Sequence, residues 1–318
     1  MKVLITGIGG FAGTHLARFL QDQSCEVAGT VSPKSRQKSK TDKDDIKASR
    51  VFECDIQRFA DVQKTLESFQ PDLIFHLAAI TEESFAKQFP QETYSTNVIG
   101  TINILEGVRQ AKLDPMIMVA GSSAEYGQIA KEENPVKETN VFRPLSFYGA
   151  SKVAQAMVAR QYFLAYGVRT LGAIAFNYFG PNQKEKFVCS ALAKQIALIE
   201  KGVNPPEIHV GNTHTWRDFT DVRDVVRAYW LLGTTGVPGE TYNVCSGEPI
   251  SIQDLLEKLI GLSKVEIKIV QDPEKKRALD VSYQSGDFEK LHRQTGWKPE
   301  IPLQQSLEDI LDYWRGAV

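Results

Sequence analysis

The first twenty residues limit the fold more than any other part of the chain. Residues 2–6 read Lys-Val-Leu-Ile-Thr, a short apolar strand, and glycines follow at positions 7, 10 and 13. The apolar residues from 14 to 20 then recur at helical spacing. A strand, a glycine turn and a helix are the context in which such glycines bind a dinucleotide, because the backbone can approach a pyrophosphate at the helix N-terminus. We therefore predict an α/β protein with a Rossmann-type, doubly wound parallel sheet.

The end of the second predicted strand bears on which dinucleotide is bound. Residues 26–31 form this strand, and Ser32 follows where NAD-binding folds usually carry an acid for the ribose 2′-hydroxyl. Lys34 and Arg36 come next and are able to hold a 2′-phosphate. The same two residues also fit solvated charges in the polar loop from 32 to 49. We expect NADP(H) rather than NAD(H), and both interpretations of the loop stay open.

Two further strand ends are expected at the cofactor. Asp55 ends a third predicted strand and is placed to accept a hydrogen bond from an adenine amine. The predicted strand from residue 72 to 79 ends in Leu-Ala-Ala, and such small side chains let a cofactor lie against the backbone. His76 in this strand has no partner of the triad or metal-site type. We interpret it as a hydrogen-bonded core histidine.

A tyrosine and a lysine four residues apart supply the expected chemistry. Pro144 precedes and Gly167 follows a segment that reads as one helix, on which Tyr148 and Lys152 share a face. An ammonium beside a phenol favours the phenolate and lowers the tyrosine pKa from its usual value of about 10. Such a tyrosine can exchange a proton with an alcohol or an alkoxide. Because the chain has ten tyrosines, a Tyr-x-x-x-Lys sequence has roughly an even chance of occurring at random. The pair is therefore informative only together with the motifs around it.

A serine is expected to complete the group. Residues 115–120 form the next predicted strand, and Gly-Ser-Ser-Ala-Glu-Tyr-Gly at 121–127 runs off its carboxyl end. Ligands of open α/β sheets bind outside these strand ends. A hydroxyl at Ser122 or Ser123 is therefore placed to face the helix that carries Tyr148 and Lys152.

Together these motifs resemble the extended short-chain dehydrogenase/reductase family, which contains sugar-nucleotide epimerases, dehydratases and reductases. The resemblance covers nearly the whole chain. Its motifs are Thr6-Gly-x-x-Gly-x-x-Gly13, His76-Leu-Ala-Ala79, Ser95-Thr-Asn97, Ser122, Tyr148-x-x-x-Lys152, Phe176-Asn177, Arg217-Asp-Phe and Gly296-Trp297. The resemblance implies that Tyr148 is the acid/base, that Lys152 holds the nicotinamide ribose and lowers the tyrosine pKa, and that Ser122 hydrogen-bonds the C4 oxygen of the sugar.

The remaining site residues follow from the strand ends and the resemblance together. The expected cofactor contacts are Gly7, Gly10, Phe11, Ala12, Gly13, Ser32, Lys34, Arg36, Asp55, Ile56, Leu77, Ala78, Ala79, Asn97, Tyr148 and Lys152. The expected substrate contacts are Ser123, Glu125, Asn177, Arg217 and Arg277, of which the arginines would face a diphosphate. We interpret Trp216 and Trp297 as packing residues rather than as base-stacking ones.

One position separates the possible reactions. Within the family the chain is similar to the reductases that convert a GDP-4-keto-6-deoxy sugar to GDP-D-rhamnose, in residues 121–127, 193–196, 217–224 and 242–247. The related 4,6-dehydratases carry a glutamate two places after the serine position, where this chain has Ala124, and Glu125 stands one residue late. This favours the reductase. A 4,6-dehydratase, a C4 epimerase and a cofactor-sensing binding protein stay as alternatives.

One departure from the family pattern is visible. The family often has an arginine two residues before the Phe-Asn pair, and this chain has Ile174 there. We assign no consequence to that change from the sequence.

Chain length and composition bear on the possible partners and on the location of the protein. The chain has 318 residues, 42% of them hydrophobic, and a net charge of −2, which indicates no nucleic-acid or membrane partner. The four cysteines lie far apart without metal-ligand spacing, so we expect reduced cysteines, no metal and a cytoplasmic enzyme. Neither a signal peptide nor a membrane span is indicated.

The chain order also suggests two domains. We expect residues 1–175, with about 215–245, to form the dinucleotide-binding domain, and residues 176–214 and 246–318 to bind a GDP-sugar. The resemblance implies a homodimer that forms through the helices carrying Asn97 and Tyr148.

Overall fold

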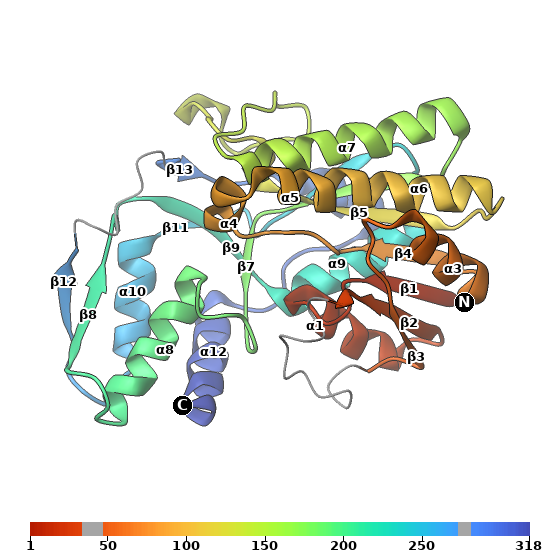
Figure 1. The fold of residues 1–318 in the computed structure, drawn as a ribbon. Coiled ribbons are helices and arrows are strands. Elements are labelled where there is room, and N and C mark those ends of the chain that lie inside the picture. Colours follow the sequence, from red (N-terminus) through yellow and green to blue (C-terminus); the bar gives the residue numbers. More distant parts are fainter. Residues whose placement is uncertain (34–46, 273–280) are drawn as a thin grey trace.

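The computed structural model describes residues 1–33, 47–272 and 281–318, so Lys34, Arg36 and Arg277 lie outside the described residues. Its main feature is a sheet of seven parallel strands in the order β10-β6-β5-β4-β1-β2-β3 (Figure 1). These strands are β1 (Lys2–Thr6), β2 (Glu26–Val31), β3 (Arg50–Glu53), β4 (Leu73–His76), β5 (Met116–Ser122), β6 (Thr170–Ala175) and β10 (Thr241–Val244). The order reverses between β1 and β4, so the predicted doubly wound parallel sheet is confirmed.

Helices cover both faces of this sheet (Figure 1). The helices α1 (Phe11–Phe19) and α9 (Val222–Thr235) pack together on one face. On the other face, α3 (Phe59–Phe69) packs against α6 (Gly100–Gln110), and α6 packs against α7 (Phe147–Tyr166). Short helices precede α6, namely α4 (Glu83–Gln88), α5 (Pro90–Tyr94) and the π-helical turn η3 (Ser95–Ile99). Within the described ranges, no helix is long and apolar enough to cross a membrane.

Strand β1 shows why the layers form. Its residues Val3, Leu4 and Ile5 are completely buried. Because side chains alternate along a strand, Val3 and Ile5 lie in the core beneath α1 and α9, whereas Leu4 lies in the core beneath α3 and α6. Each such side chain stabilises the fold by roughly 1.5–3 kcal/mol. An apolar run without polar alternation therefore requires helices on both faces of its sheet.

A smaller lobe follows β6 in the chain. Strand β9 (Trp216–Asp221) is its centre and pairs with β7 (Asn177–Phe179), β11 (Pro249–Ser251) and β13 (Tyr283–Gln284). Strands β8 (Glu207–Val210) and β12 (Lys268–Gln271) form a separate pair. The helices of this lobe are α8 (Val188–Glu200), α10 (Ile252–Gly261) and α12 (Leu303–Ala317), which share one core.

The two lobes interleave along the chain. Of the stretch from about 215 to 245 that we assigned to the larger domain, α9 and β10 lie against the large sheet, whereas β9 pairs in the small one. Near the C-terminus, α11 (Glu289–Thr295) and Trp297 return to the core of the large sheet. We therefore propose that the smaller domain consists of the strands and helices named above for the smaller lobe.

Asp218 ties the lobes together. This residue of β9 is fully buried, and its carboxylate accepts hydrogen bonds from the backbone N–H groups of Ser246 (2.8 Å), Gly247 (2.9 Å) and Gly286 (3.1 Å). The Ser246 hydroxyl adds a fourth bond of 2.6 Å. The first two partners follow β10 of the large sheet and the third follows β13 of the small one. The Asp218 carboxylate therefore supplies the hydrogen-bond acceptors for the backbone N–H groups at the junction of the two lobes.

We expect Asp218→Ala to lower the free energy of unfolding by about 3–5 kcal/mol, since each buried donor left unpaired costs about 1–3 kcal/mol. The measurement is denaturant unfolding. Asp114→Ala is the matched control, because this aspartate is exposed and lies 3.8 Å from Arg169, so its loss should change stability by less than about 1 kcal/mol. Equal small effects of both changes would show that Asp218 does not hold the junction.

Candidate active site

The predicted helix that carries Tyr148 and Lys152 is confirmed as α7. Its start is fixed by Ser146, whose hydroxyl accepts a hydrogen bond from the N–H of Gly149 at 3.0 Å, and its end is fixed by Gly167 with φ +70°. Tyr148 is half-buried in the first turn, and Lys152 follows one turn later as a buried side chain. Both functional groups therefore stand on one rigid element.

The serine lies where β5 ends. Ser122 is the last residue of the strand, and the short turn η4 (Ser123–Glu125) follows at once. A Cβ on Gly149 would lie 2.5 Å from the carbonyl oxygen of Ala124, so only glycine lets α7 start so close to η4. This contact brings Tyr148 against Ser122, and the two side chains form a hydrogen bond.

The protonation of Tyr148 differs from the sequence expectation. Burial raises the pKa of the phenol above its ordinary value, and the hydrogen bond with Ser122 offsets this only in part. Lys152 does not contribute, because its ammonium donates at 2.5 Å to the carbonyl oxygen of Ala120 and at 2.5 Å to Gln155. The expected lowering of the pKa by Lys152 is therefore not seen in this structure. Tyr148 is held in its protonated, acidic form.

His76 is a core histidine, as predicted. It is buried, its Nδ1 is 2.8 Å from the Thr6 hydroxyl, and its Nε2 is 2.9 Å from the Thr101 hydroxyl. Burial lowers its pKa to about 3, so the ring is neutral. Gln155 donates to the same Thr101 hydroxyl at 2.8 Å. A chain of polar side chains thus connects Lys152 to the end of β1, and no sequence motif indicated the part that Gln155 and Thr101 play in it.

The glycine loop fits a dinucleotide. Gly7 has φ +71°, and a Cβ there would lie 2.9 Å from Cα of Ala78. A Cβ on Gly13 would lie 2.5 Å from the Gly7 carbonyl oxygen. The loop therefore closes tightly between the ends of β1 and β4, and it leaves the N-terminus of α1 open for an anion.

The other expected cofactor residues have different surroundings. Ala12 is buried at the start of α1, and Phe11 stacks on Tyr178 of β7, with 5.9 Å between the ring centroids. Asp55 accepts from the N–H of Gln57 at 3.1 Å, and the Ile56 side chain packs under Gly100. Half-buried residues follow the ends of β2 and β4, namely Ser32, Leu77, Ala78 and Ala79.

Asn97 is a structural link rather than an open cofactor donor. Its amide bonds both the N–H (2.8 Å) and the carbonyl oxygen (3.0 Å) of Ile80, and it also donates to Ser151 of α7 at 2.9 Å. Because both amide hydrogens are used, Asn97 fixes the loop after β4 against α7. It lies in the π-helical turn η3, a distortion that is frequent at functional sites.

The expected substrate residues divide into two groups. Ser123 and Glu125 are buried, and the Ser123 carbonyl oxygen accepts from Gln284 of the smaller lobe at 3.0 Å. Asn177 and Arg217 are half-buried at the junction with β9, where Asn177 donates to the carbonyl oxygen of Asp218 at 3.4 Å.

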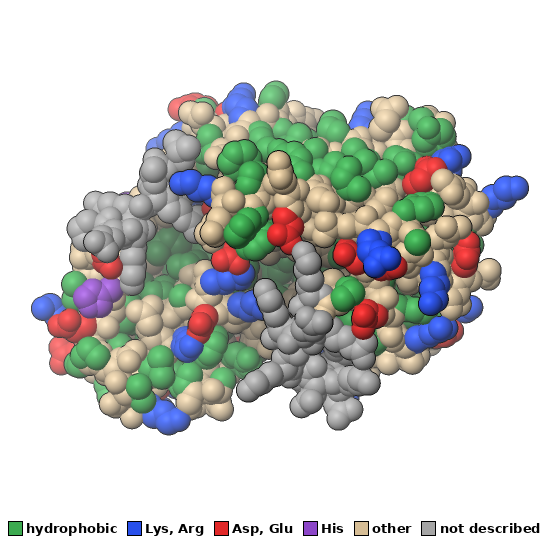
Figure 2. Space-filling view, in the orientation of Figure 1, with side chains coloured by type: hydrophobic (Ala, Val, Ile, Leu, Met, Phe, Trp, Pro, Cys, Tyr) green, Lys and Arg blue, Asp and Glu red, His purple; other side chains and the backbone are tan. Residues whose placement is uncertain are grey.

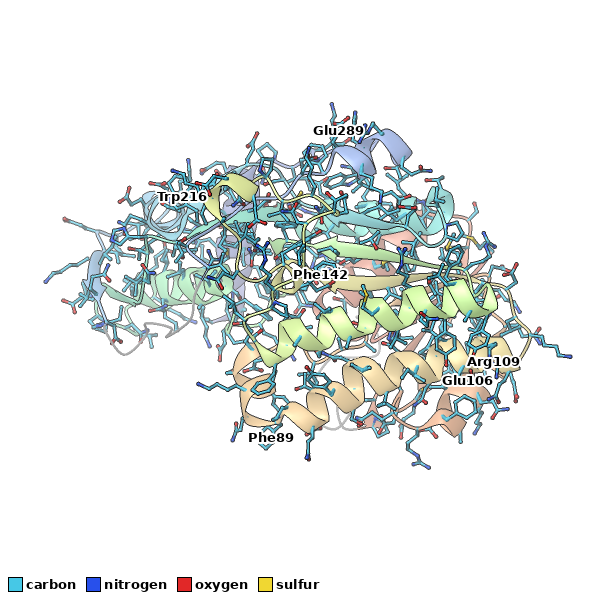
Figure 3. The ribbon with its side chains drawn as sticks, turned by 90° about the horizontal axis from the view of Figure 1, so that it is seen from above. Phe89, Glu106, Arg109, Phe142, Trp216 and Glu289 are labelled. Atoms are coloured by element: carbon cyan, nitrogen blue, oxygen red, sulfur yellow. The ribbon has the colours of Figure 1, made fainter. Side chains whose placement is uncertain are left out.

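The two tryptophans differ. Trp297 is completely buried and donates to the carbonyl oxygen of Asp224 at 3.0 Å, so the expectation of a packing residue is confirmed. Trp216 is less buried than Trp297. Its side chain is 39% exposed at the start of β9, beside Tyr283, and stands at the surface of the smaller lobe (Figure 3).

Comparison with known proteins identifies the fold and the family. Residues 4–310 match the family model described as GDP-mannose 4,6 dehydratase. The chain is 33% identical to GDP-6-deoxy-D-mannose reductase of Pseudomonas aeruginosa over 100% of this chain and 98% of that protein. It is 26% identical to GDP-mannose 4,6 dehydratase 1 of Arabidopsis thaliana, over 97% of this chain and 88% of that protein.

Solved structures agree with this result. The RMD protein of Pseudomonas aeruginosa, complexed with NADPH, superposes with a TM-score of 0.88 at 33% identity, over 100% of this chain and 99% of that one. The UDP-glucose 4-epimerase of Thermus thermophilus, in complex with NAD, gives a TM-score of 0.87 at 26% identity, over 100% of both chains. The chain therefore belongs to the GDP-mannose 4,6-dehydratase family of NAD(P)-dependent, extended short-chain dehydrogenases/reductases.

Proposed function

We propose that this protein reduces the C4 keto group of GDP-4-keto-6-deoxy-D-mannose with NADPH and forms GDP-D-rhamnose. The observation that carries the proposal is the contact between Ser122 and a protonated Tyr148, beside Ala124 at the place of the dehydratase base. The 33% identity to a GDP-6-deoxy-D-mannose reductase supports the choice of substrate.

The arrangement suits reduction because reduction needs an acid. A nicotinamide cofactor, when bound, would supply the hydride for C4. Ser122 and Tyr148 are then placed to hold the C4 oxygen, and Tyr148 donates its proton to that oxygen as negative charge develops there. Burial keeps the phenol protonated at neutral pH, which is the form that the reaction consumes. We assign Asn177 and Arg217, with Arg277, to the diphosphate of the substrate.

Dehydration and epimerisation are less well supported. A dehydratase needs a base at the sugar, and the methyl group of Ala124 cannot serve as one. Glu125 does not replace it, because its carboxylate is turned away from the sugar side and accepts from the N–H of Ser122 at 2.7 Å. A C4 epimerase shares the serine, tyrosine and lysine, and a cofactor-sensing protein would not need them.

The experiment that tests the proposal is turnover of the keto sugar with added NADPH, with the C4 configuration of the product read by NMR. We expect NADPH oxidation and no formation of a keto sugar from GDP-mannose with NADP⁺. Clear dehydration of GDP-mannose, or interconversion of C4 epimers without added reductant, would overturn the proposal.

Tyr148→Phe should lower kcat by about 10²–10⁴-fold, because it removes the acid that protonates the C4 oxygen. The affinity for NADPH, measured by titration of nucleotide fluorescence, should change little. Tyr166→Phe is a suitable control, since this tyrosine lies at the far end of the same helix and is 60% exposed. Near-normal turnover by Tyr148→Phe would show that Tyr148 does not donate the proton to the C4 oxygen.

The choice of NADP(H) rests on the loop after β2. Substituting Lys34 and Arg36 together by glutamine should weaken NADPH by at least about tenfold and spare NADH, because a charge-assisted hydrogen bond contributes roughly 1.5–3 kcal/mol. Competitive binding of the two cofactors gives the comparison. Equal losses of affinity for NADPH and NADH would favour the other interpretation, in which Lys34 and Arg36 are solvated charges.

We also propose a homodimer that forms through α7 and the helix from η3 to α6. These helices run side by side, with Phe89 at one end and Glu106 and Arg109 at the other (Figure 3). Hydrophobic side chains form a band over them (Figure 2). The exposed ones include Ile99, Phe147, Met157 and Leu164, and such a band is typical of an interface. A monomer in sedimentation experiments would contradict the proposal.

A cytoplasmic location is part of the same proposal. All four cysteines are free thiols, three of them buried, which suits a reducing compartment. We expect no nucleic acid and no membrane among the partners.

A further inference from the structure

A cavity lies behind the catalytic serine. It occupies about 30 Å³ beneath the ends of β5 and β6, between these strands and α7, and it is lined by Glu125, Lys152, Gln155 and Thr241. The exposed residues Arg160 and Glu240 also line it, so it extends toward the surface. A volume of this size holds about two water molecules when polar groups surround it. Neither Ser122 nor Tyr148 lines it.

Glu125 lines this cavity and has one carboxyl oxygen without a hydrogen-bond partner in the described part of the chain. The residue is completely buried, and its Oε1 accepts from the N–H of Ser122 at 2.7 Å. Among the described residues, no hydrogen-bond partner exists for Oε2. The carboxyl group fits under the end of β5 only because position 121 is glycine, where a Cβ would lie 2.8 Å from Oε1. Its neighbour on β6 is the apolar Ile174, so β6 offers it no cation there.

Lys152 is the positive group that shares the cavity. Its buried ammonium donates to the carbonyl oxygen of Ala120 and to the side-chain oxygen of Gln155. Burial lowers the pKa of Lys152 and raises that of Glu125, and the charge of each partly offsets the effect on the other. A buried ammonium, a buried carboxyl group with one oxygen unpaired among the described residues, and room for water form an arrangement through which a proton can pass.

We propose that Glu125 and Lys152, joined by water in this cavity, act as one buried proton relay that returns to Tyr148 the proton spent in each reduction. This inference rests on the proposed function. Tyr148 gives its proton to the C4 oxygen and becomes a phenolate. Lys152 then turns from Gln155 and gives one ammonium proton to the phenolate, so Lys152 becomes neutral. The protonated form of Glu125, which burial makes accessible near neutral pH, then passes its proton through the cavity water to Lys152. The Glu125 carboxylate takes one proton back from solvent, which balances the single proton that reduction consumes.

Other ionisable groups around the relay have their own partners. His76 approaches from β4 and is neutral. Tyr126 of the chain after η4 donates to Asn243 at 2.7 Å, and burial keeps it protonated. Glu240, at the outer part of the cavity, is paired with Lys290 at 2.7 Å. Arg160 of α7 is exposed. Glu125 is therefore the buried acid that can exchange a proton with Lys152.

Glu125→Gln tests the relay, because the amide keeps the shape and an oxygen for the N–H of Ser122. We expect the first turnover of NADPH, followed by stopped flow, to stay within about twofold of the wild type, since Tyr148 starts protonated. Steady-state turnover should fall about tenfold, because each later cycle waits for a proton. The alkaline limb of the kcat profile should move to lower pH by roughly one unit, since Lys152 loses the carboxylate that raises its pKa.

Glu240→Gln is the matched control. It removes a carboxylate from the outer part of the same cavity and leaves Glu125 in place. Its first turnover, its steady-state turnover and the alkaline limb of its kcat profile should therefore match those of the wild type. An unchanged steady-state rate in Glu125→Gln would mean that the proton enters from the substrate side and would overturn the inference. The inference would also be overturned if Glu125→Gln slowed the first turnover as much as the steady state and left the alkaline limb of the kcat profile unmoved. Glu125 would then only position Ser122.

An infrared titration of the wild-type protein keeps the test independent of folding and of the substrate. A buried, protonated carboxyl group gives a carbonyl band that shifts in heavy water. We expect this band to grow as the pH falls through the neutral range and to be missing from Glu125→Gln, since burial raises the pKa of Glu125. The comparison separates it from any band of Asp218, whose pKa burial also raises. Absence of the Glu125 band would overturn the relay even if the protein reduces the keto sugar, whereas its presence together with no turnover of the keto sugar would contradict the proposed function alone.

Discussion

The site depends on one close contact between backbones. The first turn of α7 lies against η4 because Gly149 has no side chain, and the Ala124 carbonyl oxygen occupies the place where a Cβ would stand. The large sheet fixes the end of β5, the Ser146 cap fixes the start of α7, and this contact fixes the distance between them. Any larger residue at position 149 would push Tyr148 away from Ser122 without touching either side chain.

Burial then decides the charges that the site can carry. Tyr148, His76 and Tyr126 are all kept neutral, because desolvation is the largest influence on each of their pKa values. For Glu125 and Lys152, burial raises the pKa of the carboxyl group and lowers that of the ammonium, and the charge of each partly offsets the effect of burial on the other. A buried lysine without a counter-charge would lose its proton more readily, and a site that depends on an ammonium could not rely on it.

The parts that the sequence predicted are those that follow local rules. The glycine loop, the helix of Tyr148 and Lys152, the parallel sheet and the core histidine all come from residue type and spacing, which short-range geometry determines. The sequence did not show that Lys152 turns toward Gln155, because that direction depends on Ala120, thirty-two residues earlier in the chain. Nor did it show that β9 pairs within the smaller sheet, since strand pairing there joins segments far apart in sequence.

A single residue position separates Glu125 from the dehydratase base, and the turn explains why that shift matters. Ser122 caps η4, and Glu125 is the third residue after it, so the two form a capping box in which the carboxylate returns to the N–H of Ser122. The Ser-x-x-Glu spacing is visible in the sequence and predicts this inward direction. A glutamate at position 124 could not close the box, and its carboxylate would stay available to a ligand. Because of the register of this short turn, the Glu125 carboxyl group lies at the cavity behind Ser122. It does not lie beside the sugar, where it would act as a base.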